Sequence, residues 1–97
     1  MFIVSLTYKT ELSEVDKHIE DHIAFLEKYY ANGNFIASGR KVPRTGGVIL
    51  VQAPSKAEVE KIIQEDPFNI EGLANYEITE FLPSMTSKEF ESLKNHT

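Results

Sequence analysis

Four stretches of the chain have the hydrophobic pattern of β-strands. Residues 2–8 alternate between two faces with a period of two, and residues 74–79 do the same. Residues 35–38 and 48–52 are short, mainly apolar runs, each preceded by a glycine-containing turn. We therefore predict four strands.

Two longer stretches have the 3.6-residue period of amphipathic helices. The first helix is predicted over residues 13–31, with Ser13 as its N-cap and Gly33 just beyond its end. The second begins after Ser55, which forms a predicted capping box with Glu58, and it ends at Asp66 because the residue before a proline avoids the α region. The apolar stripe predicted for the first helix consists of Val15, Ile19, Ile23, Leu26 and Tyr30.

The predicted order of elements is βαββαβ, followed by a C-terminal extension. Right-handed crossovers place both helices on one face of a four-stranded antiparallel sheet, with the first and third strands in its centre. This is an α+β, ferredoxin-like architecture. We expect residues 1–83 to form this domain and residues 84–97 to form an extension with a short helix, for which Thr86 and Glu89 are the predicted capping box.

The two central strands are apolar on both faces. This pattern is visible in residues 2–4 and 48–51, and strands of this kind are normally covered on both sides. The two helices cover only one face. The simplest cover for the other is the sheet of a second copy, so we predict a homodimer through the sheet faces. The alternative is that the short tail helix folds across this face.

Composition narrows the class of protein. The chain has 97 residues and a mass of 11.0 kDa, so we expect one small core. It has no cysteine, which excludes disulfides, thiolate metal sites and a cysteine nucleophile. A formal charge of −5 argues against nucleic acid or an anionic membrane as the main partner. Without a long apolar run or a secretion signal, we expect a cytoplasmic protein.

Positive charge is concentrated in one predicted hairpin loop. Arg40, Lys41 and Arg44 lie within five positions, and the chain has no other arginine. The guanidinium group offers a two-pronged donor to carboxylates, so the loop predicts the binding of a small anion. The alternative is that these cations pair with acidic residues of the first helix or of a partner subunit.

His22 is the first candidate for acid–base chemistry. It lies on the predicted apolar stripe of the first helix, where a partly buried imidazole can act as an acid or a base. The alternative is a structural histidine bonded to a backbone carbonyl. His18 stands four residues earlier, a spacing that two metal ligands can have. No third ligand accompanies the pair, so we predict no metal site.

Asp66, Ser38 and Gly39 are further candidates. Asp66 is explained either as the turn residue before Pro67 or as a carboxylate that orients His22. Ser38 and Gly39 end the second strand, where a hydroxyl can bind an anion and a glycine lets a ligand approach the backbone. The alternative for both is an ordinary strand end. No glycine-rich nucleotide-binding pattern is present, so we expect no cofactor.

Several of these segments together resemble the YciI-like (YCII-related) family. In chain order, the matching segments are His22 with Gly33, Phe35–Gly39, Gly46–Val51, Glu65–Phe68 and Gly72–Ile78. The resemblance covers residues 1–83, and the order and spacing of the segments make it specific. Arg40 departs from the family, which usually has proline after this glycine, so the family's substrates do not carry over.

This resemblance implies a dimeric α/β barrel in which two sheets pack face to face. It also implies a pocket with a His–Asp pair, which corresponds to His22 and Asp66, with Ser38 close by. One branch of the family consists of dehydrochlorinases that act on chlorinated hydroxyquinol-type compounds, while most members have no assigned reaction.

From the residues and the resemblance together, we expect a cofactor-independent lyase or hydrolase acting on a small cyclic or anionic substrate. Asp66 would orient His22 for acid–base catalysis, while Ser38 and Arg40 would hold an oxyanion. The predicted ligand-binding residues are Gly39, Arg40, Lys41 and Arg44. The alternatives are a non-catalytic ligand-binding or sensing module and a structural assembly domain without an enclosed pocket.

Overall fold

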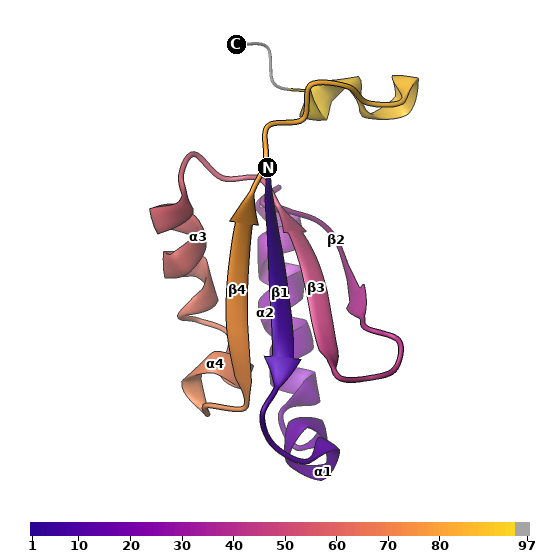
Figure 1. Cartoon of the computed structure of the whole chain (residues 1–97). Helices are drawn as coiled ribbons and strands as arrows, with labels where there is room; N and C mark the ends of the chain where they lie inside the picture. The colour runs from indigo at the N-terminus through magenta and orange to yellow at the C-terminus, as the bar shows by residue number, and fades with distance from the viewer. Residues whose placement is uncertain (95–97) are drawn as a thin grey trace.

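Four antiparallel strands form a single sheet in the computed structural model, which describes residues 1–94. The strands are β1 (Phe2–Tyr8), β2 (Phe35–Arg40), β3 (Gly46–Val51) and β4 (Ala74–Glu80). Their order across the sheet is β2-β3-β1-β4, so the first and third strands are central (Figure 1). The predicted α+β, ferredoxin-like architecture is confirmed.

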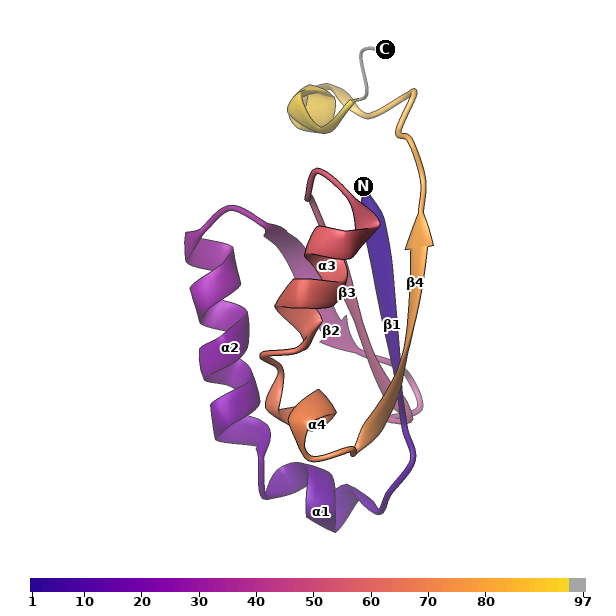
Figure 2. The same ribbon diagram turned by 90° about the vertical axis from the view of Figure 1, so that its left-hand side faces the viewer.

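The main helices cover one face of this sheet. They are α2 (Ile19–Ala31) and α3 (Lys56–Ile63), and the shorter α1 (Leu12–Asp16) and α4 (Pro67–Ile70) lie near one end of the sheet (Figure 2). A final 3₁₀ helix, η1 (Lys88–Leu93), lies beyond the opposite end. None of the helices within residues 1–94 has the length and apolar character needed to cross a membrane.

The first predicted helix is divided in two. Its continuity over residues 13–31 is wrong, because α1 ends at Asp16 and α2 begins at Ile19. Ser13 is also not the N-cap, since α1 begins one residue earlier and Glu11 precedes it. The break lets Val15 enter the core from α1 while α2 has a direction of its own.

The core-facing side of α2 differs from the predicted stripe. Phe25 and Tyr29 are the buried residues of this helix, whereas Ile23 and Tyr30 are exposed. Both buried rings pack against Phe35 of β2, with centroids 5.6 and 5.4 Å from its own. Aromatic packing therefore sets the rotation of α2, and the aliphatic period alone could not reveal it.

Serine and aspartate side chains cap the helices that follow β3. The Ser55 hydroxyl accepts a hydrogen bond from the Glu58 backbone N–H at 3.3 Å, so the predicted cap of α3 is confirmed. Asp66 lies beyond the end of α3 and caps α4, with Pro67 in the first position of that helix. The chain thus turns from α3 into α4 at the aspartate.

The two faces of the sheet have different surroundings. Phe2, Val4 and Leu6 of β1 are buried beneath the helices, whereas Ile3 on the opposite side is only partly buried. Ile3 pairs with Leu50, which is also only partly buried. Within residues 1–94, no helix covers this second face (Figure 2), and the tail does not lie across it. We call it the open face.

The β2–β3 hairpin depends on Gly46 for close approach to β1. A Cβ atom at this position would lie 1.8 Å from the Leu6 carbonyl oxygen, which belongs to the backbone and cannot move aside cheaply. Gly39 in the same hairpin has no atom within 4 Å of the corresponding position. The two glycines therefore form a matched pair for a test of packing.

We expect Gly46→Ala to destabilise the protein by about 3 kcal/mol, because the methyl group forces β3 away from β1. Gly39→Ala is the control, and it should change the free energy of unfolding by less than about 1 kcal/mol. Urea denaturation of both variants measures the difference. Equal effects would show that the contact at Gly46 is not what constrains the hairpin.

Candidate functional site

A cavity of about 330 Å³ lies between α2 and the sheet, next to the β2–β3 hairpin. It exists because β2 contributes small or flexible side chains here and does not fill the space below α2. Five candidate residues border it: His22, Ser38, Gly39, Arg40 and Arg44. Lys41 does not border the cavity, and Asp66 lies behind the ring of His22.

His22 and Asp66 form a direct hydrogen bond. The Nδ1 atom of His22 lies 2.8 Å from the Oδ1 atom of Asp66, although the residues are 44 positions apart in the sequence. Asp66 is fully buried, and the His22 side chain is largely buried. A buried carboxylate is stable only where hydrogen-bond donors surround it.

Two further donors complete the surroundings of Asp66. The Phe68 backbone N–H donates to Oδ1 at 3.0 Å, and the Tyr76 hydroxyl donates to Oδ2 at 2.5 Å. Burial raises the pKa of Tyr76 above its ordinary value, and the charge of Asp66 raises it further. Tyr76 therefore remains a donor at neutral pH.

The network around Asp66 assigns the tautomer of His22. Because Asp66 accepts every bond in the network, the proton of the imidazole lies on Nδ1 and the Nε2 atom is left for a ligand. The ring of Phe68 fixes the plane of the imidazole, since the two rings are stacked with centroids 4.0 Å apart and planes inclined by 7°. Such an imidazole is oriented before any ligand arrives.

Ser38 lies on the β2 side of the same cavity. Its hydroxyl forms a 2.7 Å hydrogen bond with the hydroxyl of Tyr30, which comes from α2. Ser38 pairs with Ile49 in the register of the sheet, so it shares the helix-covered face with the core residues. Gly39 is the next residue and borders the same cavity, and it pairs with Val48 in the register of the sheet.

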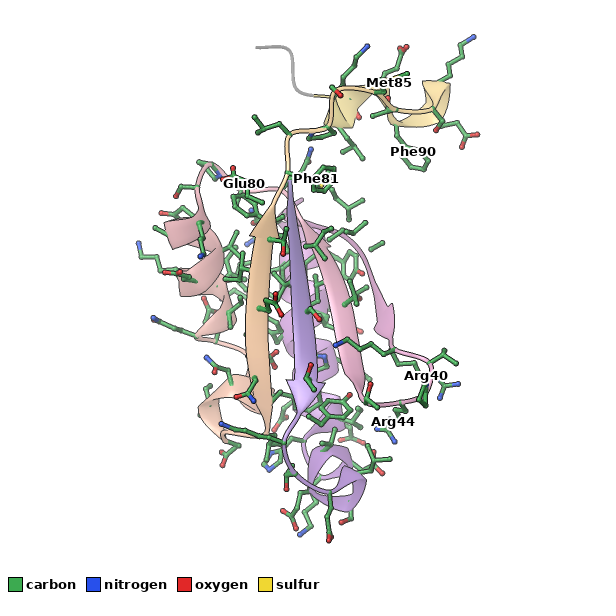
Figure 3. The ribbon with its side chains drawn as sticks, in the orientation of Figure 1. Arg40, Arg44, Glu80, Phe81, Met85 and Phe90 are labelled. Atoms are coloured by element: carbon green, nitrogen blue, oxygen red, sulfur yellow. The ribbon has the colours of Figure 1, made fainter. Side chains whose placement is uncertain are left out.

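The three cations of the hairpin have different surroundings. Arg44 binds Asp16 of α1 at 2.6 Å, a bond that raises the pKa of the guanidinium, and this is the pairing with the first helix considered above. Lys41 donates to the Thr7 hydroxyl at 3.1 Å. Arg40 has no ion-pair partner within residues 1–94, and Figure 3 shows it at the hairpin beside Arg44. Arg40 is thus the cation available to a ligand.

His18 and His22, which have the spacing of two metal ligands, lie in different surroundings. His18 occupies the position before α2, and its carbonyl oxygen accepts the His22 backbone N–H at 3.0 Å. Among the described residues, no three side chains of histidine, aspartate or glutamate gather to hold a metal ion.

The sequence analysis did not identify Tyr76, Phe68 and Tyr30 as residues of the candidate site. Tyr76 lies on the helix-covered face of β4, two residues after the buried Ala74, and it could have been noticed as a polar tip on a core position. The position of Phe68 in the turn after Asp66 gave no comparable signal of stacking.

We expect Tyr76→Phe to lower the free energy of unfolding by about 1–3 kcal/mol, because it leaves a buried carboxylate oxygen without a donor. Tyr30→Phe removes the same atom from a more exposed hydrogen bond and should cost less than about 1 kcal/mol. Urea denaturation at pH 7 compares the two. Equal costs would show that the Tyr76 bond does not stabilise Asp66.

The same variant has an alkaline signature. The pKa of Tyr76 is raised in the folded protein, so its contribution to stability is complete below the unfolded value of about 10 and is lost as the pH rises further. Tyr76→Phe cannot lose this contribution. The free energy of unfolding of Tyr76→Phe should therefore fall less steeply with pH than that of the wild type above about pH 10. Urea denaturation of both proteins at a series of alkaline pH values measures the two slopes.

Comparison with solved structures shows a protein of the same fold. A similar solved structure is 5-chloro-2-hydroxyhydroquinone dehydrochlorinase (TftG) from Burkholderia phenoliruptrix AC1100, in complex with 2,5-dihydroxybenzoquinone. Its TM-score is 0.73 at 20% sequence identity, with 84% of this chain and 93% of that chain covered. At this identity the likeness shows a shared fold.

Sequence comparison gives the family. No curated protein matches the sequence. The family model described as the YCII-related domain matches residues 1–82, which is most of the chain. The ferredoxin-like fold agrees with this match. The protein therefore belongs to the YCII-related family.

Proposed function

We propose that this protein is a small-molecule enzyme in which His22 and Asp66 form an acid–base pair. The observation that carries the proposal is the 2.8 Å bond between a fully buried carboxylate and an imidazole that borders a cavity. Paired groups of this kind, in a cleft and oriented by further hydrogen bonds, are typical of active sites. The structural likeness to a dehydrochlorinase supports a lyase.

The geometry suits a base-promoted elimination. Nε2 of His22 would take a proton from the substrate, the electron pair of the broken bond would form a double bond, and an anionic leaving group such as chloride would depart. Asp66 would stabilise the imidazolium that results. The proton later passes to solvent, so the overall change is loss of one proton and one anion, and the step requires no redox cofactor.

The remaining polar groups of the cavity suit a substrate with negative charge. Arg40 would pair with a carboxylate or phenolate oxygen, and the absence of an ion pair to it within residues 1–94 supports this role. Ser38 would hold a second oxygen of the substrate. In the bond between the hydroxyls of Ser38 and Tyr30 one hydroxyl donates to the other, and the O–H of the accepting hydroxyl can donate to a ligand. Gly39 would border the ligand with its backbone, and we place Lys41 and Arg44 at the periphery, where they contribute charge.

We also propose that the protein is a homodimer through the open face. Ile3, Val48 and Leu50 are only partly buried there, and nothing within residues 1–94 covers them. A central pair of strands with an apolar second face is stabilised by a second layer. A second copy supplies such a layer with the same chemistry.

We expect His22→Ala to lower kcat by about 100-fold or more on a substrate found in a panel of chlorinated and hydroxylated aromatic acids and phenols. Binding of the same compound, followed by NMR titration, should change much less. His18→Ala is the control, because this histidine stands one turn away and does not border the cavity. Equal turnover by wild type and His22→Ala would end the catalytic proposal, and binding without turnover by the wild type would favour a ligand-binding module.

Asp66→Asn tests the second member of the pair. It retains the shape of the side chain and removes the charge that stabilises the imidazolium, so kcat should fall by about 10²–10⁴-fold. Circular dichroism and urea denaturation establish whether the variant is folded. A folded variant with unchanged kcat would contradict the assigned role of Asp66.

A further inference from the structure

The C-terminal tail, which we define as Phe81–Leu93, has a set of apolar side chains that its own domain does not cover. Met85 is 87% exposed, Leu82 64% and Phe90 51%. Phe81 is also exposed, although its backbone N–H still bonds to the Met1 carbonyl oxygen at 2.9 Å. Exposed apolar side chains gathered on one short segment are typical of a contact surface.

The helix within this tail meets its own domain at one end, where Leu93 is partly buried and borders a second cavity together with Met1 and Pro54, whereas residues 88–92 are exposed. The helix η1 has six residues, 3₁₀ geometry and no buried residue, and its N-cap Ser87 forms no side-chain hydrogen bond. Isolated helices of this length are unstable in water, because nucleation is costly and 3₁₀ hydrogen bonds are weaker than those of an α-helix. The hydroxyl of Thr86 is buried without a partner within the described residues. The exposed side of this helix is therefore free to pack against a further surface.

The tail and the cavity lie at opposite ends of the molecule. Figure 3 shows Met85 and Phe90 beyond the end of β4, while Arg40 and Arg44 lie at the other end of the sheet. The cavity is bordered by Leu6 at the far end of β1. Because η1 lies beyond the end of the sheet that is opposite the cavity (Figure 2), a contact between tail and cavity must involve a second molecule.

The cavity mouth has features that match the tail. On α2, Ile23 and Tyr30 present exposed apolar surface next to the cavity-lining Leu26. On β2, Arg40 has no ion-pair partner within residues 1–94. The tail offers apolar side chains together with Glu89 and Glu91, neither of which has an ion-pair partner in the part of the chain that the structure describes.

We propose that the tail of one copy docks across the cavity mouth of a second copy, with its apolar side chains on α2 and its acidic side chains facing Arg40. The contact is reciprocal in a dimer with two-fold symmetry, so each copy gives one tail and receives one. The partner's Met85 or the partner's Phe90 would then form a wall of the cavity that a single chain lacks. This contact does not depend on which reaction, if any, takes place there.

A spin label on the tail tests the contact directly. The chain has no cysteine, and Met85 is exposed, so Met85→Cys introduces a single labelling site without disturbing the core. The nitroxide-bearing variant, which contains no ¹⁵N, is mixed with wild-type protein that is labelled with ¹⁵N. Any loss of amide signal in the ¹⁵N chain then comes from the tail of another copy.

We expect the amides of Ile23, Ser38 and Arg40 to lose most of their intensity, while a diamagnetic label at the same cysteine leaves them unchanged. A nitroxide at Lys61→Cys, on the exposed side of α3, is the second control and should spare these three amides. Loss confined to the open face, at Ile3 and Leu50, would overturn the proposal by placing the tail elsewhere. Absence of any intermolecular loss would overturn it as well.

A shortened chain gives an independent measurement. A variant ending at residue 83 lacks η1 and keeps the strands and the His22–Asp66 bond. We expect the dimer of this variant to dissociate at higher protein concentrations than the dimer of the full chain, because the reciprocal contact is lost. Sedimentation velocity over a dilution series measures the two dissociation constants. An unchanged dissociation constant would contradict a stabilising role for the tail. The spin-label result reports on the contact even if no substrate for the protein is found.

Discussion

Burial of the Asp66 carboxylate is the constraint that organises this domain. An unpaired charge removed from water costs several kcal/mol, so every oxygen of this group must meet a donor. The donors come from three different elements: the imidazole of His22 on α2, the backbone of α4 and the hydroxyl of Tyr76 on β4. One carboxylate thereby joins a helix, a turn and a strand at a single point.

This arrangement explains how a small core can hold a functional site rigidly. The side chain of Asp66 begins α4 as its N-cap, so the backbone that positions the carboxylate is stabilised by the same oxygen that binds His22. Phe68 follows in the same helix and stacks on the imidazole. The turn after α3 therefore determines both the partner and the plane of His22, and the structural role of Asp66 and the role proposed for it in the candidate site rest on the same oxygen atom.

Much of this could be predicted from the sequence, because periodicity reports which face of an element is buried. Periodicity predicted the four strands. The handedness of the crossovers placed β1 and β3 in the centre, and the capping motif identified Ser55 as a cap. The buried side of α2 was not predictable, because aromatic contacts of Phe25 and Tyr29 with Phe35 decide its rotation and those contacts join segments that are apart in the sequence. For the candidate site, His22 and Asp66 were visible as residue types, whereas Tyr76 became visible only when the sheet placed it beside Asp66.

The hairpin cations show why charge alone does not locate a ligand. Three cations within five positions predicted one basic patch, but Arg44 binds Asp16 and Lys41 binds Thr7, so their positions are set within the chain. Arg40 differs because it borders the cavity without such a partner among the described residues. A cation at the mouth of a cavity changes which ligands bind there, because an anion is attracted to it and a neutral ring is not. Under the proposed function, the specificity of this site should therefore depend on the charge of the ligand at the position of Arg40, while the His22–Asp66 pair determines the orientation of the imidazole.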